Sequence, residues 1–518
     1  MKHVIAYDLG TGGCKTSLYD ADGRCLAGEF HAYETRYPQP RWHEQRPEDW
    51  WKAIVDGTRR VMSSTGVARE SVAACAISGH SLGVVPVDAE GGLIGEWIPI
   101  WSDSRPDADQ TEPFFRKVSQ EEWYAQTGNG FPPPLYSVFK MMWMRDHQPD
   151  AFRRVFKIIG TKDYLNLKMT DRVATDVSYA SGCGVFDLVK REYSPALLSA
   201  SGLPGEILPD VLQSTDVVGS LTAQAAAELC LPEGMLVMAG GVDNSCMSLG
   251  ARAYRDGRVY NSLGSSSWIA ASTSRPLMDV RTRPYVFAHV VPGQYVSACG
   301  VFSTGTSMRW MRDQLCSDLV AAEKAGGPNA YSAMCDLAAT SPLGSRGLLF
   351  NPTLAGGSSL DQSPHCCGGF VGLTLGHTRA DMIRATLEGV AMALRVALDA
   401  LEALHPIERD MIVVGGGAKN AFWRQIYADV YGKRIVKTSV DQQAAALGAA
   451  ALALVGAGLW KDFSRIDELH EAEAINEPDL QNQKAYAARM PLYRDLMNYL
   501  SSYGDAVAAG HFAQKSSH

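Results

Sequence analysis

The feature of this sequence that most constrains its fold is a set of motifs that occurs twice in the same order. The three matched pairs are residues 9–13 with 263–267, 72–79 with 412–417, and 242–251 with 440–449. In the last pair, a Val-Asp step is followed at identical spacing by Leu-Gly-Ala. Because strands, Gly-rich turns and helix starts recur at a long period, the sequence predicts a duplicated α/β unit with crossover helices.

The length of the chain also points to two units, because 518 residues exceed what one hydrophobic core usually organises. We expect one domain over residues 1–246 and a second over residues 247–518, one for each copy of the motifs. The first copy is the longer, and its extra residues fall between Asp103 and Ser194. Insertions in one half of a two-domain enzyme commonly build the substrate pocket, so we expect the substrate to bind to the first domain.

Composition and charge argue against several classes of protein. The net charge is −8 and no Lys/Arg cluster occurs, so a nucleic-acid partner is not expected. The longest apolar run, residues 444–460, is dominated by Ala and Gly, which predicts a packed internal helix rather than a membrane span. The 11 cysteines are scattered without CxxC spacing, so we expect reduced thiols and a cytoplasmic location.

An acidic residue stands at the end of a predicted buried strand near the middle of the chain. The apolar run 235–239 is followed by Gly240, Gly241 and then Asp243. Ligands of open α/β sheets collect outside the carboxyl ends of the strands, where a carboxylate can act as a base or a metal ligand. The alternative interpretation is an N-cap for the helix that begins near Ser245.

Two predicted hairpins have tips rich in Gly, Thr and Ser. The first tip is Gly10, Thr11, Gly12 and Gly13, and the second is Gly264, Ser265 and Ser266. Such a tip presents several backbone N–H groups together, which suits a phosphate, although a hairpin turn also needs glycine without any ligand. Asp8 ends the strand before the first tip, where it is placed to hold Mg²⁺ through water. Lys15 follows the tip, where it would neutralise phosphate charge.

Two phosphate-binding hairpins that face each other describe a nucleotide site shared by two domains. The Gly-rich segment 415–417 with Asn420 adds small residues that let a flat ring approach the backbone. The chemistry to expect is phosphoryl transfer, in which Asp243 accepts the proton of the attacking hydroxyl. The P-loop pattern does not occur, and no Gly-x-Gly-x-x-Gly follows the first strand, so P-loop and dinucleotide-binding folds are disfavoured.

At this point the residues resemble the FGGY carbohydrate kinases, most closely the xylulokinase-like branch, along nearly the whole chain. The segments that carry the resemblance are 8–15, 140–147, 368–388 and 415–429. The resemblance implies two duplicated ribonuclease-H-like (actin-like ATPase) domains of class α/β, with ATP and Mg²⁺ in the catalytic cleft between them. It also implies that Asp243 is the catalytic base and that Asp8 and Asp243 hold the metal. Glu388 is expected to be a packed or bridging carboxylate.

The resemblance places the remaining contacts as well. The nucleotide contacts that it implies are Gly10, Thr11, Gly12, Gly13, Lys15, Gly264, Ser265, Ser266, Gly305, Arg309, Gly416, Gly417 and Asn420. The substrate contacts that it implies are His80, Ser81, Leu82, Trp101, Asp103, Arg105 and Asn244. Xylulokinases usually carry Gln-Met-His where this sequence has His80-Ser81-Leu82, and this departure leaves the identity of the sugar open.

We expect an ATP-dependent sugar kinase that phosphorylates a terminal hydroxyl of a small ketose, with D-xylulose to D-xylulose 5-phosphate as the first candidate reaction. A kinase for another ketose or a polyol, such as a ketohexose, glycerol or erythritol, is the alternative. A non-catalytic actin-like ATP-binding regulator is the more distant alternative. The expected partner is a small sugar or polyol, without nucleic acid or membrane, and a homodimer is left open.

Overall fold

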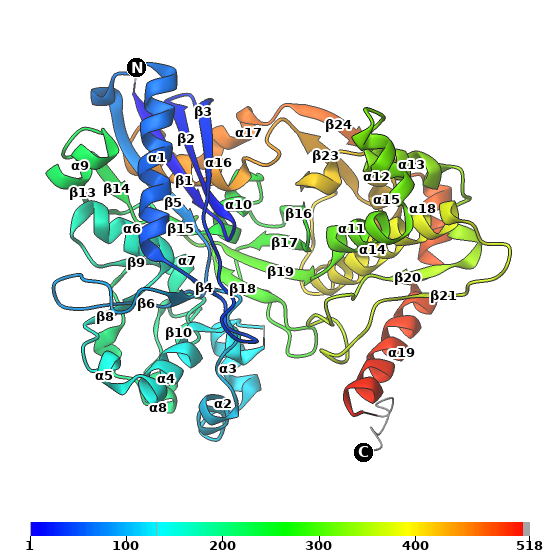
Figure 1. Ribbon diagram of the computed structural model, residues 1–518, viewed down its shortest axis with the longest axis horizontal. Coiled ribbons are helices and arrows are strands. Elements are labelled where there is room, and N and C mark those ends of the chain that lie inside the picture. The colour runs from blue at the N-terminus through cyan, green and yellow to red at the C-terminus, as the bar shows by residue number, and fades with distance from the viewer. Residues whose placement is uncertain (1, 131, 511–518) are drawn as a thin grey trace.

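The computed structural model describes residues 2–130 and 132–510, which form two α/β halves side by side (Figure 1). Each half is built on a seven-stranded sheet. The first sheet contains, in spatial order, β13 (Val217–Ser220), β14 (Leu236–Met238), β5 (Val72–Gly79), β1 (His3–Leu9), β2 (Gly13–Asp20) and β3 (Cys25–Ala32), and β15 (Gly241–Val242) pairs with the end of β5. The second sheet contains β18 (Tyr285–Ala288), β19 (Tyr295–Val301), β17 (Ser267–Thr273), β16 (Val259–Leu263), β22 (Asp410–Val414), β23 (Arg434–Thr438) and β24 (Ala472–Asn476).

The two sheets repeat one strand order, which confirms the predicted duplication. In the first sheet, β3, β2 and β1 are antiparallel neighbours, and β5 and β14 continue parallel to β1. In the second sheet, β19, β17 and β16 are antiparallel neighbours, and β22 and β23 continue parallel to β16. This shared order is the one expected of a pair of ribonuclease-H-like domains.

The strand register brings the predicted site residues of the first half to one edge of its sheet. In β1, Asp8 lies opposite Lys15 of β2 and opposite Ser78 of β5. The short strand β15 runs along β5, so that Val242 lies beside the carboxyl end of β5. The first hairpin tip, the end of β5 and the helix that begins at Asp243 therefore meet at the same edge, where ligands of such sheets bind.

Long helices bury the faces of the two sheets. Helix α1 (Pro47–Thr65) packs on β2 and β3, and it ends at Gly66, whose φ of 65° is left-handed. Helix α14 (Arg379–Glu402) covers β17 and β19. Trp50 of α1 and Leu394 of α14 are fully buried, each in the core of its own half. The other helices used below are α6 (Thr161–Thr170), α7 (Val177–Ala180), α10 (Asp243–Gly250), α11 (Thr304–Leu315), α13 (Ala330–Ala339), α15 (Ala421–Tyr431) and α16 (Ala444–Gly456).

Two helices, one from each copy of the repeat, cross at the junction of the halves. Helix α10 packs against α16, and α16 also lies on β1 and β5 of the first sheet. A Cβ added to Gly250 would lie 1.8 Å from the carbonyl oxygen of Ala444. A Cβ added to Gly448 would lie 2.0 Å from the carbonyl oxygen of Cys246. Because these are the glycines of the repeated Leu-Gly-Ala, the repeat explains how the two helices approach so closely.

The buried carboxylate of α14 has the packing role that the sequence predicted for it. Glu388 is almost completely buried. It accepts hydrogen bonds from the guanidinium of Arg384 at 2.7 Å and from the hydroxyl of Tyr486 at 2.8 Å. Glu388 therefore bridges α14 to the C-terminal part of the chain and lies away from the candidate catalytic residues.

The longer first copy gains a separate layer of helices, drawn at the lower left of Figure 1. It contains α2 (Ala108–Phe115), α3 (Gln120–Thr127), α4 (Ser137–His147) and α5 (Pro149–Phe152), which share a core around Phe139. The expected boundary between residues 246 and 247 falls inside α10, and the first strand of the second sheet in chain order, β16, begins at Val259. Within the described part of the chain, no helix is both long and apolar enough to cross a membrane.

Candidate active site

Asp243 is the first residue of α10 and follows a tight turn. Gly240 in this turn has a φ of 74°, and a Cβ there would lie 2.3 Å from the carbonyl oxygen of Ile77, so the turn requires glycine. Val242 occupies the N-cap position of α10. Asp243 is therefore the first helical residue and does not occupy the N-cap position that the alternative interpretation gave it. The Asp243 carboxylate accepts the N–H of Asn244 at 2.8 Å through Oδ1.

Two partly buried carboxylates with raised pKa values lie together at this edge of the sheet. Burial raises the pKa of Asp243 to about 7, and the negative charge of Asp8 adds to the rise. Burial likewise raises the pKa of Asp8 to about 6, against the hydrogen bond from Ser78 at 3.2 Å and the positive charge of Lys15. A carboxylate with a pKa near 7 is matched to general-base work at neutral pH.

The same two carboxylates are the candidate ligands for Mg²⁺. In residues 2–130 and 132–510, no three His, Cys, Asp or Glu side chains come together as a metal site. Magnesium usually takes one or two carboxylates from the protein and completes its octahedron with water and substrate phosphates. Asp8 and Asp243 fit that pattern, because two carboxylates at one edge of the sheet are the number that the protein usually supplies, and a divalent cation would offset the cost of keeping them charged where burial raises both pKa values.

The first hairpin tip, which joins β1 to β2, consists of the predicted residues Gly10, Thr11, Gly12 and Gly13. The N–H of Gly10 donates to the carbonyl of Gly13 at 3.0 Å. The hydroxyl of Thr11 accepts from the indole of Trp101 at 2.8 Å, and its carbonyl accepts from the amide of Gln45 at 2.7 Å. Trp101, a predicted substrate contact, therefore also fixes the tip that is predicted to bind phosphate.

The second hairpin tip, between β16 and β17, rests on the N-terminus of α11. The N–H of Gly305 donates to the carbonyl of Gly264 at 3.1 Å, and the N–H of Thr306 donates to that of Ser265 at 3.1 Å. A Cβ added to Gly305 would lie 2.3 Å from the carbonyl oxygen of Gly264. The absence of a side chain at Gly305 therefore sets how closely the helix approaches the tip.

A cavity of about 620 Å³ opens beside this second tip. The predicted nucleotide contacts that line it are Gly264, Ser265, Gly305, Arg309, Gly416, Gly417 and Asn420. The other lining residues are Leu263, Met308, Asn329, Tyr331, Ser332, Cys335, Lys419 and Trp423, of which Trp423 belongs to the segment 415–429 that carries the family resemblance. Small-molecule sites have volumes of about 300–1,000 Å³, and glycine backbone facing aromatic rings suits a flat heterocycle. The cavity thus unites four segments of the chain, residues 263–265, 305–309, 329–335 and 416–423.

The counterpart of Asp243 in the second half has a structural role. Asp441 accepts the N–H of Gly415 at 2.8 Å, which fixes the Gly-rich turn after β22. Gly415 has a φ of 97°, so this turn also requires glycine. Asn420 then caps α15 by accepting the N–H of Phe422 at 2.9 Å. In the second half, the aspartate of the duplicated turn, Asp441, therefore binds a backbone N–H. In the first half, the matching aspartate, Asp243, has its carboxylate near that of Asp8.

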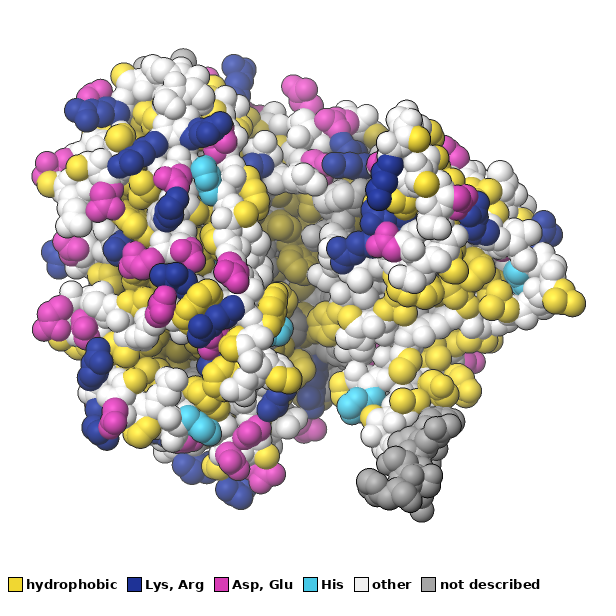
Figure 2. All heavy atoms as spheres, in the orientation of Figure 1, with side chains coloured by type: hydrophobic (Ala, Val, Ile, Leu, Met, Phe, Trp, Pro, Cys, Tyr) yellow, Lys and Arg dark blue, Asp and Glu magenta, His cyan; other side chains and the backbone are white. Residues whose placement is uncertain are grey.

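A smaller cavity of about 110 Å³ lies between the halves, where Figure 2 shows the molecule hollowed. Its polar corner contains Trp101 and Asn244 of the first half and Ser266 of the second. Its wall includes Tyr260, Trp268, Tyr285, Phe287 and Phe302. The hydroxyl of Tyr260 accepts from the Trp268 indole at 2.9 Å and donates to the carbonyl of Asn244 at 3.3 Å. Both halves therefore contribute to the cavity that Asn244, the neighbour of Asp243 in the chain, lines.

Other predicted substrate contacts lie in the interior of the first half. The His80 ring is 1% exposed and packs on Trp50, and burial lowers its pKa to about 3, so the ring is neutral. Leu82 is part of the apolar core, while Ser81 is only partly buried. Asp103 is fully buried and binds the guanidinium of Arg105 at 2.8 Å. Direct contact of these residues with a ligand stays a prediction.

A buried lysine ties the loops that carry these residues together. Lys140 of α4 donates through Nζ to the carbonyl of Leu82 at 3.0 Å and to that of Ile100 at 2.7 Å. Burial lowers the pKa of Lys140 to about 7, although the charge of Asp103 opposes the fall. Arg105 extends the scaffold by an ion pair with Glu44 at 2.6 Å. The interior residues therefore brace the two loops that present Ser81 and Trp101.

Comparison with known proteins agrees with this arrangement. The sequence pattern of the FGGY family of carbohydrate kinases matches twice, its N-terminal domain over residues 3–250 and its C-terminal domain over residues 259–457. A xylulose kinase of Bacillus subtilis (strain 168) is 27% identical over 98% of this chain and 99% of its own length. Two structures from Lactobacillus acidophilus, a ligand-bound xylulose kinase and a gluconate kinase, each have a TM-score of 0.89 and 25% identity. They cover 98% and 97% of this chain and 100% and 99% of their own.

Proposed function

This chain belongs to the FGGY family of carbohydrate kinases, and from that membership we propose that it transfers the γ-phosphoryl group of ATP to a terminal hydroxyl of a small ketose. D-xylulose is the first candidate substrate, with D-xylulose 5-phosphate as product. The observation that carries the proposal is the partly buried carboxylate of Asp243, which lies at the carboxyl edge of the first sheet with a pKa of about 7.

In the proposed reaction, Asp243 is the general base. The substrate hydroxyl gives its proton to a carboxylate oxygen of Asp243 while the hydroxyl oxygen attacks the γ-phosphorus of ATP. The bond from that phosphorus to the β–γ bridging oxygen breaks, and ADP leaves. A base with a pKa of about 7 accepts a proton readily at neutral pH. Mg²⁺, when held by Asp8 and Asp243, supplies positive charge against the phosphates.

The two hairpin tips and the larger cavity provide the proposed nucleotide site. The cavity beside the second tip would take the adenosine, because a Cβ at Gly416 would meet nothing within 4 Å, so a flat ring can approach the backbone there. The tips would then present N–H groups to the phosphates. Lys15, which lies opposite Asp8 in the sheet, would neutralise part of the phosphate charge. Closure of the halves would exclude water from the transfer.

The sugar identity is the part of the proposal with an open alternative. Relatives include xylulose kinases and a gluconate kinase, each described so by its own name. The alternative is a kinase for another ketose or for a polyol. It is favoured by the segment 80–82, in which the side chains of His80 and Leu82 are buried and only Ser81 is partly accessible. A hydroxyl at that position can serve a differently substituted carbon chain.

The test is release of ADP from MgATP in a coupled assay across ketoses, polyols and sugar acids. The proposal expects one small ketose to give the highest kcat/KM, with D-xylulose at or near the top. If a polyol or a sugar acid were the best substrate, the proposed kinase activity would stand and the proposed ketose substrate would be wrong. A chain that binds ATP and phosphorylates none of these compounds would overturn the proposed activity and favour a regulator.

A further inference from the structure

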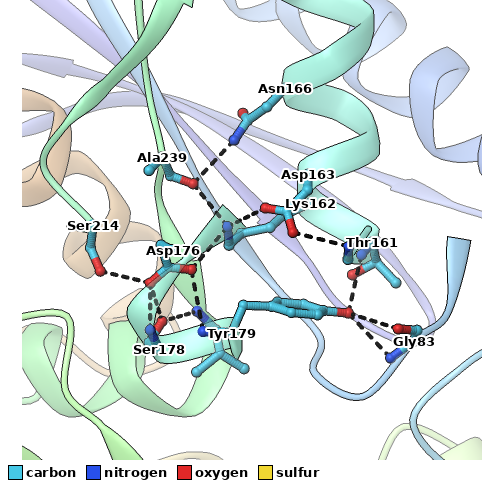
Figure 3. Close-up of polar contacts among 12 residues, drawn as sticks. Gly83, Thr161, Lys162, Asp163, Asn166, Asp176, Ser178, Tyr179, Ser214 and Ala239 are labelled. Carbon is cyan, nitrogen blue, oxygen red and sulfur yellow. Dashed lines mark hydrogen bonds and ion pairs between the residues drawn. The ribbon is translucent and has the colours of Figure 1, made fainter. Parts of the chain in front are cut away.

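A cluster of three charged side chains is completely buried in the first half, outside every cavity described above. Lys162 and Asp163 begin α6, and Asp176 precedes α7; each of the three is 0–1% exposed. The ammonium of Lys162 contacts Asp163 at 2.5 Å and Asp176 at 2.9 Å (Figure 3). Burial lowers the pKa of Lys162, but the two carboxylates outweigh it and hold that pKa above its ordinary value. The lysine therefore stays charged.

One set of hydrogen bonds connects this cluster to the four residues that precede Asp243, residues 239–242. Lys162 donates to the carbonyl of Ala239 at 3.0 Å, and Asn166 donates to the same oxygen at 3.1 Å (Figure 3). The hydroxyl of Ser178 donates to Asp176 at 2.5 Å and accepts the N–H of Val242 at 2.9 Å. Backbone groups on both sides of the glycine turn are thus held by the cluster.

A second hydroxyl reaches the same carboxylate oxygen in a different way. Ser214 donates to Oδ2 of Asp176 at 2.8 Å, as Ser178 does. Ser214 contacts the turn only through its backbone carbonyl, which accepts the N–H of Gly240 at 3.0 Å. The side chain of Ser178 therefore bonds the segment before Asp243 directly, whereas the side chain of Ser214 bonds only the carboxylate.

The other set of hydrogen bonds holds the loop after β5. The hydroxyl of Thr161 donates to the carbonyl of His80 at 2.8 Å. The hydroxyl of Tyr179 accepts the N–H of Thr161 at 3.1 Å and that of Gly83 at 3.2 Å (Figure 3). A Cβ added to Gly79 would lie 2.7 Å from the Cβ of Lys162, so the loop and α6 are in close contact. One buried cluster thus fixes both strand ends that face the candidate substrate.

Positioning, rather than stability, is the contribution that such a cluster makes best. A buried ion pair is often no more stabilising than well-packed apolar residues of the same volume, since its charges lose their hydration. Its fixed hydrogen bonds nevertheless determine where the attached backbone lies. A misplacement of about 1 Å at a catalytic group can lower the rate by roughly 10²-fold, even when the change lies away from the reacting atoms.

We propose that Ser178, held by Asp176 and Lys162, is a positioning residue that fixes the backbone of residues 239–242 and thereby aims the carboxylate of Asp243 at the substrate hydroxyl. This inference rests on the proposed function of Asp243 as the base. Ser178 would contact neither substrate nor nucleotide and would act only through the backbone N–H of Val242.

The test compares Ser178→Ala with Ser214→Ala in the full chain. Both changes remove one buried hydroxyl that donates to Oδ2 of Asp176, and Ser178→Ala also leaves the N–H of Val242 without its acceptor, so both should lower the thermal midpoint and Ser178→Ala should lower it more. Ser178→Ala should reduce kcat roughly 10- to 100-fold while the KM for ATP changes less than about twofold. Ser214→Ala should keep kcat within about twofold of the parent. Lys162→Met is not the lead variant, because it would leave two buried carboxylates uncompensated and can prevent folding.

A double-mutant cycle with Asp243→Ala separates this inference from the proposed function. If Ser178 acts through Asp243, then Ser178→Ala should not lower the residual turnover of Asp243→Ala further. Additive losses in the double variant, or equal losses of kcat in Ser178→Ala and Ser214→Ala, would overturn the positioning role. Normal turnover of the single variant Asp243→Ala would instead overturn the proposed base and leave nothing for Ser178 to position.

Discussion

The raised pKa of Asp243 predicts that replacing this residue stabilises the protein in a pH-dependent way. The pKa of this carboxyl group is about 7 in the folded chain, against an ordinary value of 3.8 for an aspartate free of the fold. Between these values the folded state binds more protons than the unfolded state, so this carboxyl group's contribution to stability falls as pH rises. Asp243→Asn removes the titration. The variant should therefore gain stability over the parent as pH rises, and the gain should level off above about pH 7.

The magnitude follows from the width of the pH window. The interval from pH 5 to pH 7 spans two pH units, over which the stability of Asp243→Asn relative to the parent can rise by about 2.7 kcal/mol as an upper limit. The side chain of Asp243 is only partly buried, so solvent reduces this to the order of 1 kcal/mol. Any pH-independent effect of the substitution cancels when the two pH values are compared.

The assay is thermal unfolding of parent and Asp243→Asn in EDTA, at pH 5 and pH 8. The difference in thermal midpoint, variant minus parent, should increase by roughly 1–2 °C from the lower to the higher pH, because the shift per kcal/mol shrinks with chain length. EDTA keeps divalent cations from Asp8 and Asp243, which would otherwise neutralise the same charge. A difference in thermal midpoint that is unchanged between the two pH values, or that shrinks as pH rises, would show that the pKa of Asp243 is not raised in the folded chain.

Three other substitutions test the geometry of the site and the junction. Gly305→Ala should push α11 from the second tip and raise the KM for ATP by more than the KM for sugar; equal changes in steady-state kinetics would contradict this. Asp441→Ala should release the turn at Gly415, with the KM for ATP rising and kcat within about tenfold; a loss of kcat equal to that of Asp243→Ala would contradict a purely structural role. Gly448→Ala should lower the free energy of unfolding by about 1–3 kcal/mol; unchanged denaturant unfolding would show that the helices can separate without penalty.

The sequence predicts the fold well, because the repeat and the hairpins are local patterns. The strand and turn that end at Gly79, and their counterpart that ends at Gly417, were matched from the sequence and occupy equivalent places in the two sheets. The repeated motif by itself does not separate the roles of Asp243 and Asp441, and the base role was assigned to Asp243 from the hairpins and the family resemblance. Their difference depends on partners elsewhere in the chain, Asp8 for one and Gly415 for the other.

The interior charges were the least accessible to sequence reasoning. Lys140 and Lys162 are residues of a type that is almost always exposed, yet both are at most 1% exposed. Each becomes buried because carbonyl or carboxylate groups from distant segments surround it, and no local pattern encodes that environment. Tyr331 in the larger cavity was missed for a related reason, because a helix face that lines a ligand site has the same periodicity as one that packs in a core.

The turnover of Asp243→Ala with saturating sugar and MgATP decides whether Asp243 is the base. If Asp243 is the base, kcat should fall by roughly 10²-fold or more, because general bases contribute rate factors of 10²–10⁴. ATP should still bind, since the larger cavity and both hairpin tips are unchanged. A variant that binds ATP and turns over sugar at a near-normal rate would show that Asp243 is not the base.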